Sequence, residues 1–404
     1  MGPLAGIRVL DLSRVLAGPW AGQCLADFGA EVIKIEKPDS GDDTRTWGPP
    51  WLDLPTANTR QSAYFLSANR GKRGVAIDFT QPEGADLVRE LAKRADVILE
   101  NFKVGGLKKY GLDFDSLIAL KPSLVVCSIT GFGQTGPYAD QPGYDAMIQA
   151  QGGIMSLTGV PDGEPGAGPQ KIGVAVADLM TGMYAVSAVL AALLHARSTG
   201  IGQHIDLALL DTQVAWLANQ ALNYLVGGAV PKRLGTAHPN IVPYQSFASR
   251  DGFIMLAVGN DRQFESFCSA AGYAEIAQDE RFKSNAMRVA HRHILVPMLE
   301  IWLAQQRTDY WLTLLASVNV PCGPINALND VFEHPQVKAR GLQIHLPSHG
   351  VDVPQVANPV RFSRTPIEYR AAPPTLGQDT QAVLSEIGIS QDQFSDFKRR
   401  RIVA

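Results

Sequence analysis

The sequence predicts an α/β protein with a doubly wound parallel sheet and a second, smaller α/β domain. Short apolar segments typical of strands alternate with segments of helical periodicity through the first half of the chain. Loops rich in glycine and charged residues follow several of these strands. Alternation of this kind is typical of parallel strands joined by crossover helices.

The strands and helices are predicted in a regular order. A strand at residues 7–12 is followed by a turn and a helix, and AEVIKIEKP forms the next strand. Further strands are predicted at 74–79, in DVILENF and in SLVVCSITGFG, with PEGADLVRELAKRA and a segment around Leu117 as helices. Ligands of parallel sheets bind beyond the carboxyl ends of the strands. Binding residues are therefore expected in the loops IEKPDSGDDTR, ENFKVGG and TGFGQTGPY.

Residues 171–195 combine a long apolar run with a single acidic residue, Asp178. Helical spacing of the apolar residues and Gly200 at the end predict a helix that is buried on most sides, with Asp178 as its N-cap. A capping role needs no chemistry. Alternatively, the helix dipole and free backbone N–H groups hold the carboxylate ionised in a poorly solvated place, where it can act as a covalent nucleophile.

The second half of the chain predicts a domain boundary near residue 225. QHIDLALLDTQVAWLANQALNYL reads as a strand and one long helix, and a segment rich in turn residues follows it. A hairpin is predicted about Asp251-Gly252, with helices in 261–316. Strand signals and a final helix close the chain.

Composition excludes several classes of protein. A formal net charge of -3 gives no basic excess for nucleic acid or a membrane surface. The four cysteines form no CxxC pair, and the longest apolar run is shorter than the ~20 residues of a membrane span. No secretory signal pattern opens the sequence. We expect a cytoplasmic protein that acts on small molecules.

Known site motifs are scarce. GFGQTG at 131–136 matches G-x-G-x-x-G, but Pro137 and a polar loop follow where a dinucleotide fold opens a helix. His291 and His293 point to different helix faces, which disfavours a metal site. No G-x-S-x-G nucleophile elbow is present. Asp178 is the best nucleophile candidate.

Several segments in one order resemble class III CoA-transferases. They are RVLAGPWAGQCLADFGAEVIKIEKP, GDDTRTWGPP, NRGKRGVAID, ENFKVGGL, SITGFGQTGPY, VADLMTGMYA, GTAHPNIVPYQ and VPCGPIN. The sequences of GDDTRTWGPP and GTAHPNIVPYQ are most similar to the branch that contains succinyl-CoA:glutarate CoA-transferase. The resemblance implies a Rossmann-like large domain formed by both chain ends and a homodimer of interlocked rings. The expected divisions are 1–205 for the CoA-binding part, 206–224 for a linker helix, 225–325 for the small domain and 326–404 for the return segment.

The resemblance also implies a reaction and its residues. Asp178 matches the family's catalytic aspartate, which forms an acyl anhydride and then an aspartyl-CoA thioester, without a metal or a permanently bound cofactor. Coenzyme A is a substrate and product. Positions matching CoA-binding residues are Arg14, Lys37, Lys72, Arg73, Asn101, Phe102 and Lys109, and Tyr144 is added as a pocket residue.

Four further residues are expected at the acyl group. Leu16 stands where the formyl-CoA branch has a functional glutamine, which disfavours formyl-CoA:oxalate exchange. Gly259 and Asn260 correspond to the family's glycine-rich loop, and such a loop can offer N–H donors to a developing oxyanion. Arg45 is the expected partner of a second carboxylate on a dicarboxylic acid such as glutarate or succinate.

Two other functions remain open on the sequence. The α-methylacyl-CoA racemases resemble the chain across the same segments, but Tyr144 replaces their catalytic histidine and is a poor base at neutral pH. A non-catalytic CoA-binding scaffold, in which Asp178 only caps its helix, is the second alternative.

Overall fold

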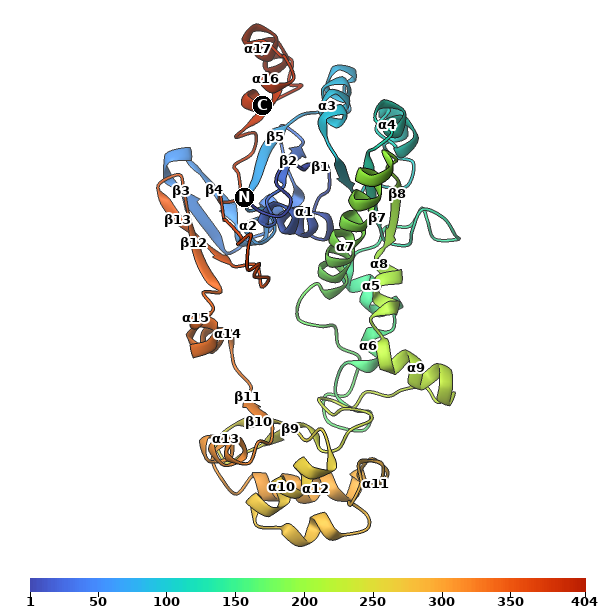
Figure 1. Ribbon diagram of the computed structural model, residues 1–404, viewed down its shortest axis with the longest axis vertical. Coiled ribbons are helices and arrows are strands. Elements are labelled where there is room, and N and C mark those ends of the chain that lie inside the picture. The colour runs from blue at the N-terminus through green and yellow to red at the C-terminus, as the bar shows by residue number, and fades with distance from the viewer. The chain divides into compact units, whose positions relative to one another are not determined.

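A computed structural model describes residues 1–404, and the chain forms two compact units (Figure 1). The first unit comprises Met1–Ile154, Lys171–Ala229 and Lys338–Ala404. The second comprises Met155–Gln170 and Val230–Val337. Residues 155–170 thus group with the smaller unit, whereas the sequence placed them in the large domain.

The first unit contains a six-stranded sheet in which every neighbouring pair is parallel. Its strands are β1 (Arg8–Asp11), β2 (Glu31–Glu36), β5 (Lys72–Ala76), β6 (Val97–Glu100), β7 (Val125–Thr130) and β8 (His204–Ala208). The spatial order is β5-β2-β1-β6-β7-β8, so it reverses between β1 and β6. Loops on either side of such a reversal diverge and leave a crevice at the carboxyl ends of the strands. The predicted parallel sheet is confirmed.

Helices cover both faces of this sheet (Figure 1). One face carries α1 (Ala17–Asp27), α5 (Asp145–Gln151) and α7 (Val176–Thr199), and the other carries α3 (Pro82–Arg94), α4 (Phe114–Leu120), α16 (Thr380–Glu386) and α17 (Gln391–Arg399). Successive side chains of a strand point to opposite faces. Val9 of β1 therefore joins the core under α1 and α7, while Leu10 joins the core under α3.

The chain end returns to the sheet. The backbone N–H of Asp78 donates to the carbonyl of Ile402 at 2.8 Å, and Ile77 and Val403 form an antiparallel bridge. Two hairpins, β3 (Trp51–Leu54) with β4 (Thr59–Ser62) and β12 (Gln343–Ser348) with β13 (Val351–Val356), complete the first unit. The first hairpin was not predicted, because its four-residue strands are too short to show a clear alternation.

The second unit has a three-stranded sheet of order β11-β10-β9. Its strands are β9 (Tyr244–Ala248), β10 (Phe253–Ala257) and β11 (Cys322–Pro324), and the pairing of Ala248 with Phe253 confirms the hairpin about Asp251-Gly252. Its helices are α10 (Asp261–Ala271), α11 (Asn285–Ala290), α12 (Arg292–Leu303), α13 (Thr308–Ser317) and α14 (Leu328–Glu333), and the boundary with the first unit falls within α15 (Pro335–Ala339). The apolar faces of α10, α12 and α13 pack with buried side chains of β9 and β10 to form its core.

The long helix predicted after β8 is two helices, α8 (Leu209–Ala215) and α9 (Ala218–Gly227). Ala218 has a φ of 44°, which a continuing right-handed helix does not allow. The remaining short elements are α2 (Ala63–Ser67), α6 (Ile154–Leu157), η1 (Asp43–Thr46), η2 (Pro55–Ala57), η3 (Lys108–Tyr110) and η4 (Ala274–Gln278).

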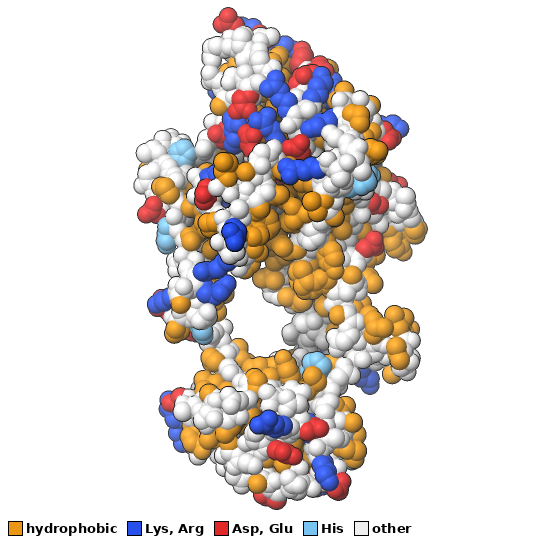
Figure 2. All heavy atoms as spheres, in the orientation of Figure 1, with side chains coloured by type: hydrophobic (Ala, Val, Ile, Leu, Met, Phe, Trp, Pro, Cys, Tyr) orange, Lys and Arg blue, Asp and Glu red, His pale blue; other side chains and the backbone are white.

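Helix α7 is long and apolar enough to cross a membrane by length and composition alone. It packs against α1, α5, α8 and β7, as the core helix of a folded domain does. Its other face exposes Met183, Tyr184 and Leu194, the last at 71%. The prediction that this helix is buried on most sides is therefore wrong for the single chain. Figure 2 shows hydrophobic side chains gathered over the region of α1 and α7.

Candidate active site

Asp178 is the third residue of α7 and does not cap it. The helix begins at Val176, and Ala175 occupies the N-cap position without a side-chain hydrogen bond. The prediction of an Asp178 N-cap is therefore wrong by three residues. Its carboxylate accepts no hydrogen bond, so helix capping does not explain an acidic residue at this position.

Asp145 braces the start of α7 and was missed in the sequence. Its Oδ1 accepts the backbone N–H of Ala177 at 2.8 Å, and its Oδ2 accepts the side-chain amide of Gln149 at 2.8 Å. The Oε1 of Gln149 accepts the N–H of Ile172 at 2.9 Å. These bonds tie α5 to the segment that leads into α7. The acidic residue beside Tyr144 in the segment GYD is the sequence feature that could have indicated this role.

Burial, and after it the negative charge of Asp145, raises the pKa of Asp178 from 3.8 to about 7. A helix N-terminus favours a negative charge by roughly 0.3–1 kcal/mol. One pKa unit corresponds to about 1.4 kcal/mol, so the dipole cannot offset this desolvation. The helix dipole therefore does not keep the pKa of Asp178 near its ordinary value. A weakly solvated carboxylate remains well suited to nucleophilic attack once it is deprotonated.

Asp178→Asn is expected to stabilise the protein increasingly as the pH rises. Because the pKa of Asp178 is about 7 in the folded state and near 3.8 when unfolded, the folded state holds the proton between these values. Stability due to that proton is lost as the pH rises through about 7. Thermal unfolding at about pH 5 and about pH 8 should therefore show a larger Tm gain for Asn at the higher pH. An equal gain at both values would contradict the raised pKa.

A cavity of about 220 Å³ lies beside Asp178. Predicted site residues reach it from three loops: Arg14 and Leu16 after β1, Asn101 and Phe102 after β6, and Tyr144 before α5. Leu16 is buried, whereas Tyr144 is 67% exposed. The structure thus brings these five predicted residues to the same cavity as Asp178.

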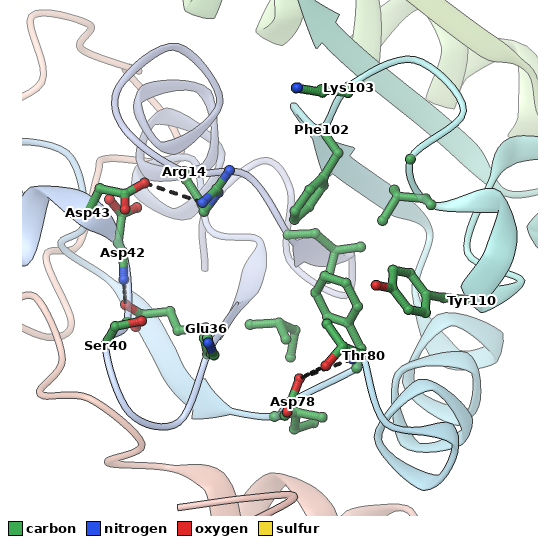
Figure 3. Close-up of a pocket in the computed structure, with 18 of the residues that line it drawn as sticks. Arg14, Glu36, Ser40, Asp42, Asp43, Asp78, Thr80, Phe102, Lys103 and Tyr110 are labelled. Carbon is green, nitrogen blue, oxygen red and sulfur yellow. Dashed lines mark hydrogen bonds and ion pairs between the residues drawn. The ribbon is translucent and has the colours of Figure 1, made fainter.

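A larger cavity of about 410 Å³ shares Arg14 and Phe102 with the first (Figure 3). Lys37 and Lys109 also line it, and both side chains are exposed. The ring of Phe102 packs edge-on against Phe79 with centroids 5.5 Å apart. Cationic side chains beside aromatic rings suit a ligand that carries phosphate groups and a heterocyclic base.

Lys103 and Tyr110 line this larger cavity and were not predicted. Both lie in the segment FKVGGLKKY, from which only Phe102 and Lys109 were singled out. Lys103 also lines the cavity of Asp178. Its position just after the end of β6 was a usable signal, since carboxyl ends of parallel strands carry ligand contacts.

Lys72 and Arg73 line neither of these two cavities. Lys72 is fully buried, and its Nζ donates to Asp11 Oδ2 at 2.9 Å and to the carbonyl of Pro19 at 2.8 Å. Arg73 forms ion pairs at 2.6 Å with Glu31 and with Glu386. Both cations are at β5 positions whose charge is matched within the protein. This geometry gives no support to the expected role of Lys72 and Arg73 as CoA ligands.

Arg45 is also committed to partners within the protein. Its guanidinium forms a bidentate pair with Glu36, at 2.7 and 2.8 Å, and donates to the carbonyl of Pro374 at 3.1 Å. It also lies over the ring of Phe65, 3.7 Å from the centroid. The structure does not bring it to the cavity of Asp178. The cations that line that cavity are Arg14 and Lys103.

Gly259 and Asn260 lie in the second unit. The Asn260 side chain caps α10 by accepting the N–H of Gln263 at 2.9 Å, and the N–H of Gly259 donates to Gln263 Oε1 at 2.8 Å. These bonds fix the turn between β10 and α10. The turn thus forms the capped N-terminus of α10 within the second unit.

The glycine motif at 131–136 follows β7 as predicted, but the next helix, α5, begins only at Asp145. A dinucleotide fingerprint needs the helix to open at the motif, so that its N-terminus meets the pyrophosphate. The structure therefore agrees with the sequence that this loop is not built as such a site.

Comparison with known proteins bears on the whole chain. A family model described as CoA-transferase family III matches residues 4–380. The chain is 52% identical to the succinate–glutarate CoA-transferase of Agrobacterium fabrum, over 95% of this chain and 96% of that protein. It is 42% identical to the succinyl-CoA:glutarate CoA-transferase of Homo sapiens, over 95% of this chain and 86% of that protein. Among solved structures, a CAIB/BAIF family protein from Brucella suis has a TM-score of 0.84 and 51% identity, covering 96% of this chain and 99% of that one.

Proposed function

The chain belongs to CoA-transferase family III and is a CoA-transferase, and we propose that it moves CoA from succinyl-CoA to a dicarboxylic acid such as glutarate. The proposed substrates rest on relatives whose names carry them. The observation that supports the chemistry is Asp178, a carboxyl with a raised pKa and no hydrogen-bond partner beside a cavity. Such a group is available for bond formation rather than for capping.

The first half of the proposed reaction loads CoA onto the protein. The carboxylate of Asp178 attacks the thioester carbonyl of succinyl-CoA, and the carbon–sulfur bond breaks to give a succinyl-aspartyl anhydride and CoA thiolate. The thiolate attacks the aspartyl carbonyl of the anhydride, and succinate leaves. The product is an aspartyl-CoA thioester.

The second half runs through the same bonds with the acceptor. The glutarate carboxylate attacks the aspartyl carbonyl, and CoA thiolate leaves again. The thiolate then attacks the glutaryl carbonyl of the second anhydride, which releases glutaryl-CoA and restores the Asp178 carboxylate. Each attack develops an oxyanion, which N–H donors held in place beforehand would stabilise.

We assign the larger cavity to the nucleotide part of CoA. It shares Arg14, Phe102 and Lys103 with the cavity of Asp178, so a ligand can extend from one to the other. Lys37 and Lys109 supply charge for phosphate groups. The side chains that Figure 3 labels surround this space from the end of β2 and from the segments after β1, β2, β5 and β6.

Lys109→Ala is expected to raise KM for succinyl-CoA by roughly 3- to 10-fold with kcat nearly unchanged, since one exposed phosphate contact contributes about 1 kcal/mol. Steady-state kinetics at low and high salt measures this, and the difference should shrink at high salt. Lys93→Ala is the matched control, because Lys93 is an exposed lysine of α3 paired with Glu90 outside the cavity. An equal effect of both variants would argue against the assignment.

The substrate proposal is tested by incubating the protein with succinyl-CoA and a set of carboxylic acids. Mass spectrometry of the CoA products should show glutaryl-CoA forming fastest. A monocarboxylic acid of similar length, such as valerate, is the control for the second carboxylate. Equal rates for valerate and glutarate would contradict the dicarboxylate assignment but would still support CoA transfer as the reaction.

We also propose a cytoplasmic homodimer of interlocked rings that binds small molecules, with a Rossmann-like large domain and no permanently bound cofactor, nucleic acid or membrane. Support for the dimer is the apolar face of α7, where Met183, Tyr184 and Leu194 are exposed. Contiguous exposed apolar surface is typical of protein interfaces. Light scattering should give twice the mass of the chain, and a single-chain mass would reject the dimer.

A further inference from the structure

The loop at residues 13–16, between β1 and α1, is bonded by side chains from outside it. The carbonyl of Ser13 accepts from Lys34 Nζ at 2.9 Å. Arg14 exchanges two hydrogen bonds with the side chain of Asn101, at 2.9 and 2.7 Å. Backbone groups that lack a regular ladder must be paired in some other way. The path of this loop is therefore set by those side chains.

Val15 is the strained residue of the loop. Its φ is 71°, in the left-handed region that a β-branched residue rarely adopts. Its N–H points at Asp42 and lies 3.3 Å from each carboxylate oxygen. Without an external partner, such a residue would relax to negative φ.

Asp42 and Lys34 form a buried ion pair at 2.9 Å, with both side chains at 0% exposure. Asp42 also accepts from the N–H and hydroxyl of Thr44, at 3.0 and 2.7 Å. The other charged groups that interact with Lys34 are Asp11, Glu36 and Lys72. A buried ion pair is seldom a net source of stability, because desolvation offsets the attraction. The Lys34–Asp42 pair instead contacts the loop, through the Ser13 carbonyl and the Val15 N–H, and can hold its backbone in place.

Leu16 follows Val15 directly and lines the cavity of Asp178. It also stands at the N-cap position of α1. A change of φ at Val15 would turn the chain just before Leu16. The left-handed Val15 thus determines which surface this loop presents to the acyl group.

We propose that the Lys34–Asp42 pair holds Val15 in its strained conformation and so positions Leu16 against the reacting carboxyl of Asp178. Asp42 is then a positioning residue that acts through the loop. The inference rests on the proposed function, because the effect is read as a rate of CoA transfer. It adds two charged residues to the site that do not touch the reacting atoms.

The test is a double-mutant cycle. Asp42→Asn keeps the size of the side chain but removes the charge that Lys34 and the N–H of Val15 face. We expect kcat for glutaryl-CoA formation to fall about 10-fold or more, since small displacements near reacting groups are costly. Adding Val15→Gly should restore most of this loss, because glycine adopts positive φ without strain.

Asp27→Asn is the matched control. It breaks the Asp27–Arg70 pair, which is nearly as buried, lies in the same unit and does not touch the loop. It should lower Tm and leave kcat unchanged. If Asp42→Asn does not fold, Lys34→Met with Asp42→Leu removes both charges together and should show the same loss of kcat.

Three kinetic results would overturn the inference: unchanged kcat in Asp42→Asn, no recovery with Val15→Gly, or an equal loss of kcat in Asp27→Asn. Amide hydrogen exchange of a peptide covering residues 12–17 separates this inference from the proposed function. The peptide should exchange faster in Asp42→Asn than in the unmodified protein, whichever acids are substrates. Equal exchange would reject the inference even if transfer is confirmed, and absent transfer would reject only the proposed function.

Discussion

Asp178→Ala is expected to lower kcat for CoA transfer by at least about 10⁴-fold, since loss of a covalent nucleophile removes the reaction path itself. Helix α7 should remain intact, because Asp178 neither caps it nor makes a hydrogen bond. Binding of succinyl-CoA should persist, since the larger cavity is lined by other residues. Steady-state kinetics and equilibrium binding measure the two effects separately.

Asp178→Asn is the control for shape, because it keeps the volume of the side chain without its nucleophilic oxygen. Both variants should also fail to form an adduct that hydroxylamine releases from the protein. If Asp178→Ala retained transfer within tenfold of the unmodified protein, Asp178 would not be the nucleophile. Exchange of an α-proton in a branched acyl-CoA, without transfer, would favour racemase chemistry instead.

Lys72→Met is expected to lower the free energy of unfolding by about 3–5 kcal/mol, the usual cost of leaving one charge of a buried pair unmatched. Asp11 would remain fully buried, and Asn69 Oδ1 and the carbonyl of Pro19 would lose their donor. KM for succinyl-CoA should stay unchanged, because Lys72 lines neither cavity of the site. Urea unfolding and steady-state kinetics give the two numbers.

The comparison with Lys109→Ala makes this prediction specific. Lys109 is exposed and lines the larger cavity, so its loss should raise KM and leave the urea midpoint in place. Opposite behaviour of the two lysines would contradict the placement of the CoA site. It would also restore Lys72 as a CoA ligand.

Much of the fold was predictable because its signals are local. Most strands of the six-stranded sheet contain an apolar run bounded by turn residues, although β5 begins with Lys72 and Arg73, and alternation with helices predicts parallel pairing. The break between α8 and α9 was not predictable, because Ala218 carries no propensity for its positive φ. The start of α7 was misplaced for a similar reason. Aspartate is a strong capping signal, and here Ala175 holds that position instead.

The site was only partly predictable because burial and pairing are properties of the folded chain. Arg14 and Lys109, which the resemblance gave as CoA-binding positions, both line the larger cavity, where Arg14 also pairs with Asp43 at 3.3 Å. Lys72 and Arg45 look the same in the sequence, yet each meets an acidic partner from another part of the chain, Asp11 and Glu36. No local pattern distinguishes a cation that lines a cavity from one that is buried in an ion pair. Family resemblance carries residues over by position and does not show this difference.

The proposed route through Asp178 is tested most directly by following the oxygen atoms of the acceptor. The protein is first loaded with succinyl-CoA and freed of succinate, then given glutarate labelled with heavy oxygen for a single turnover. The double displacement predicts that the peptide containing Asp178 gains the mass of one heavy oxygen as glutaryl-CoA forms. Glutaryl-CoA formed with an unlabelled Asp178 peptide would contradict the route and show that the acceptor never bonds to this carboxyl.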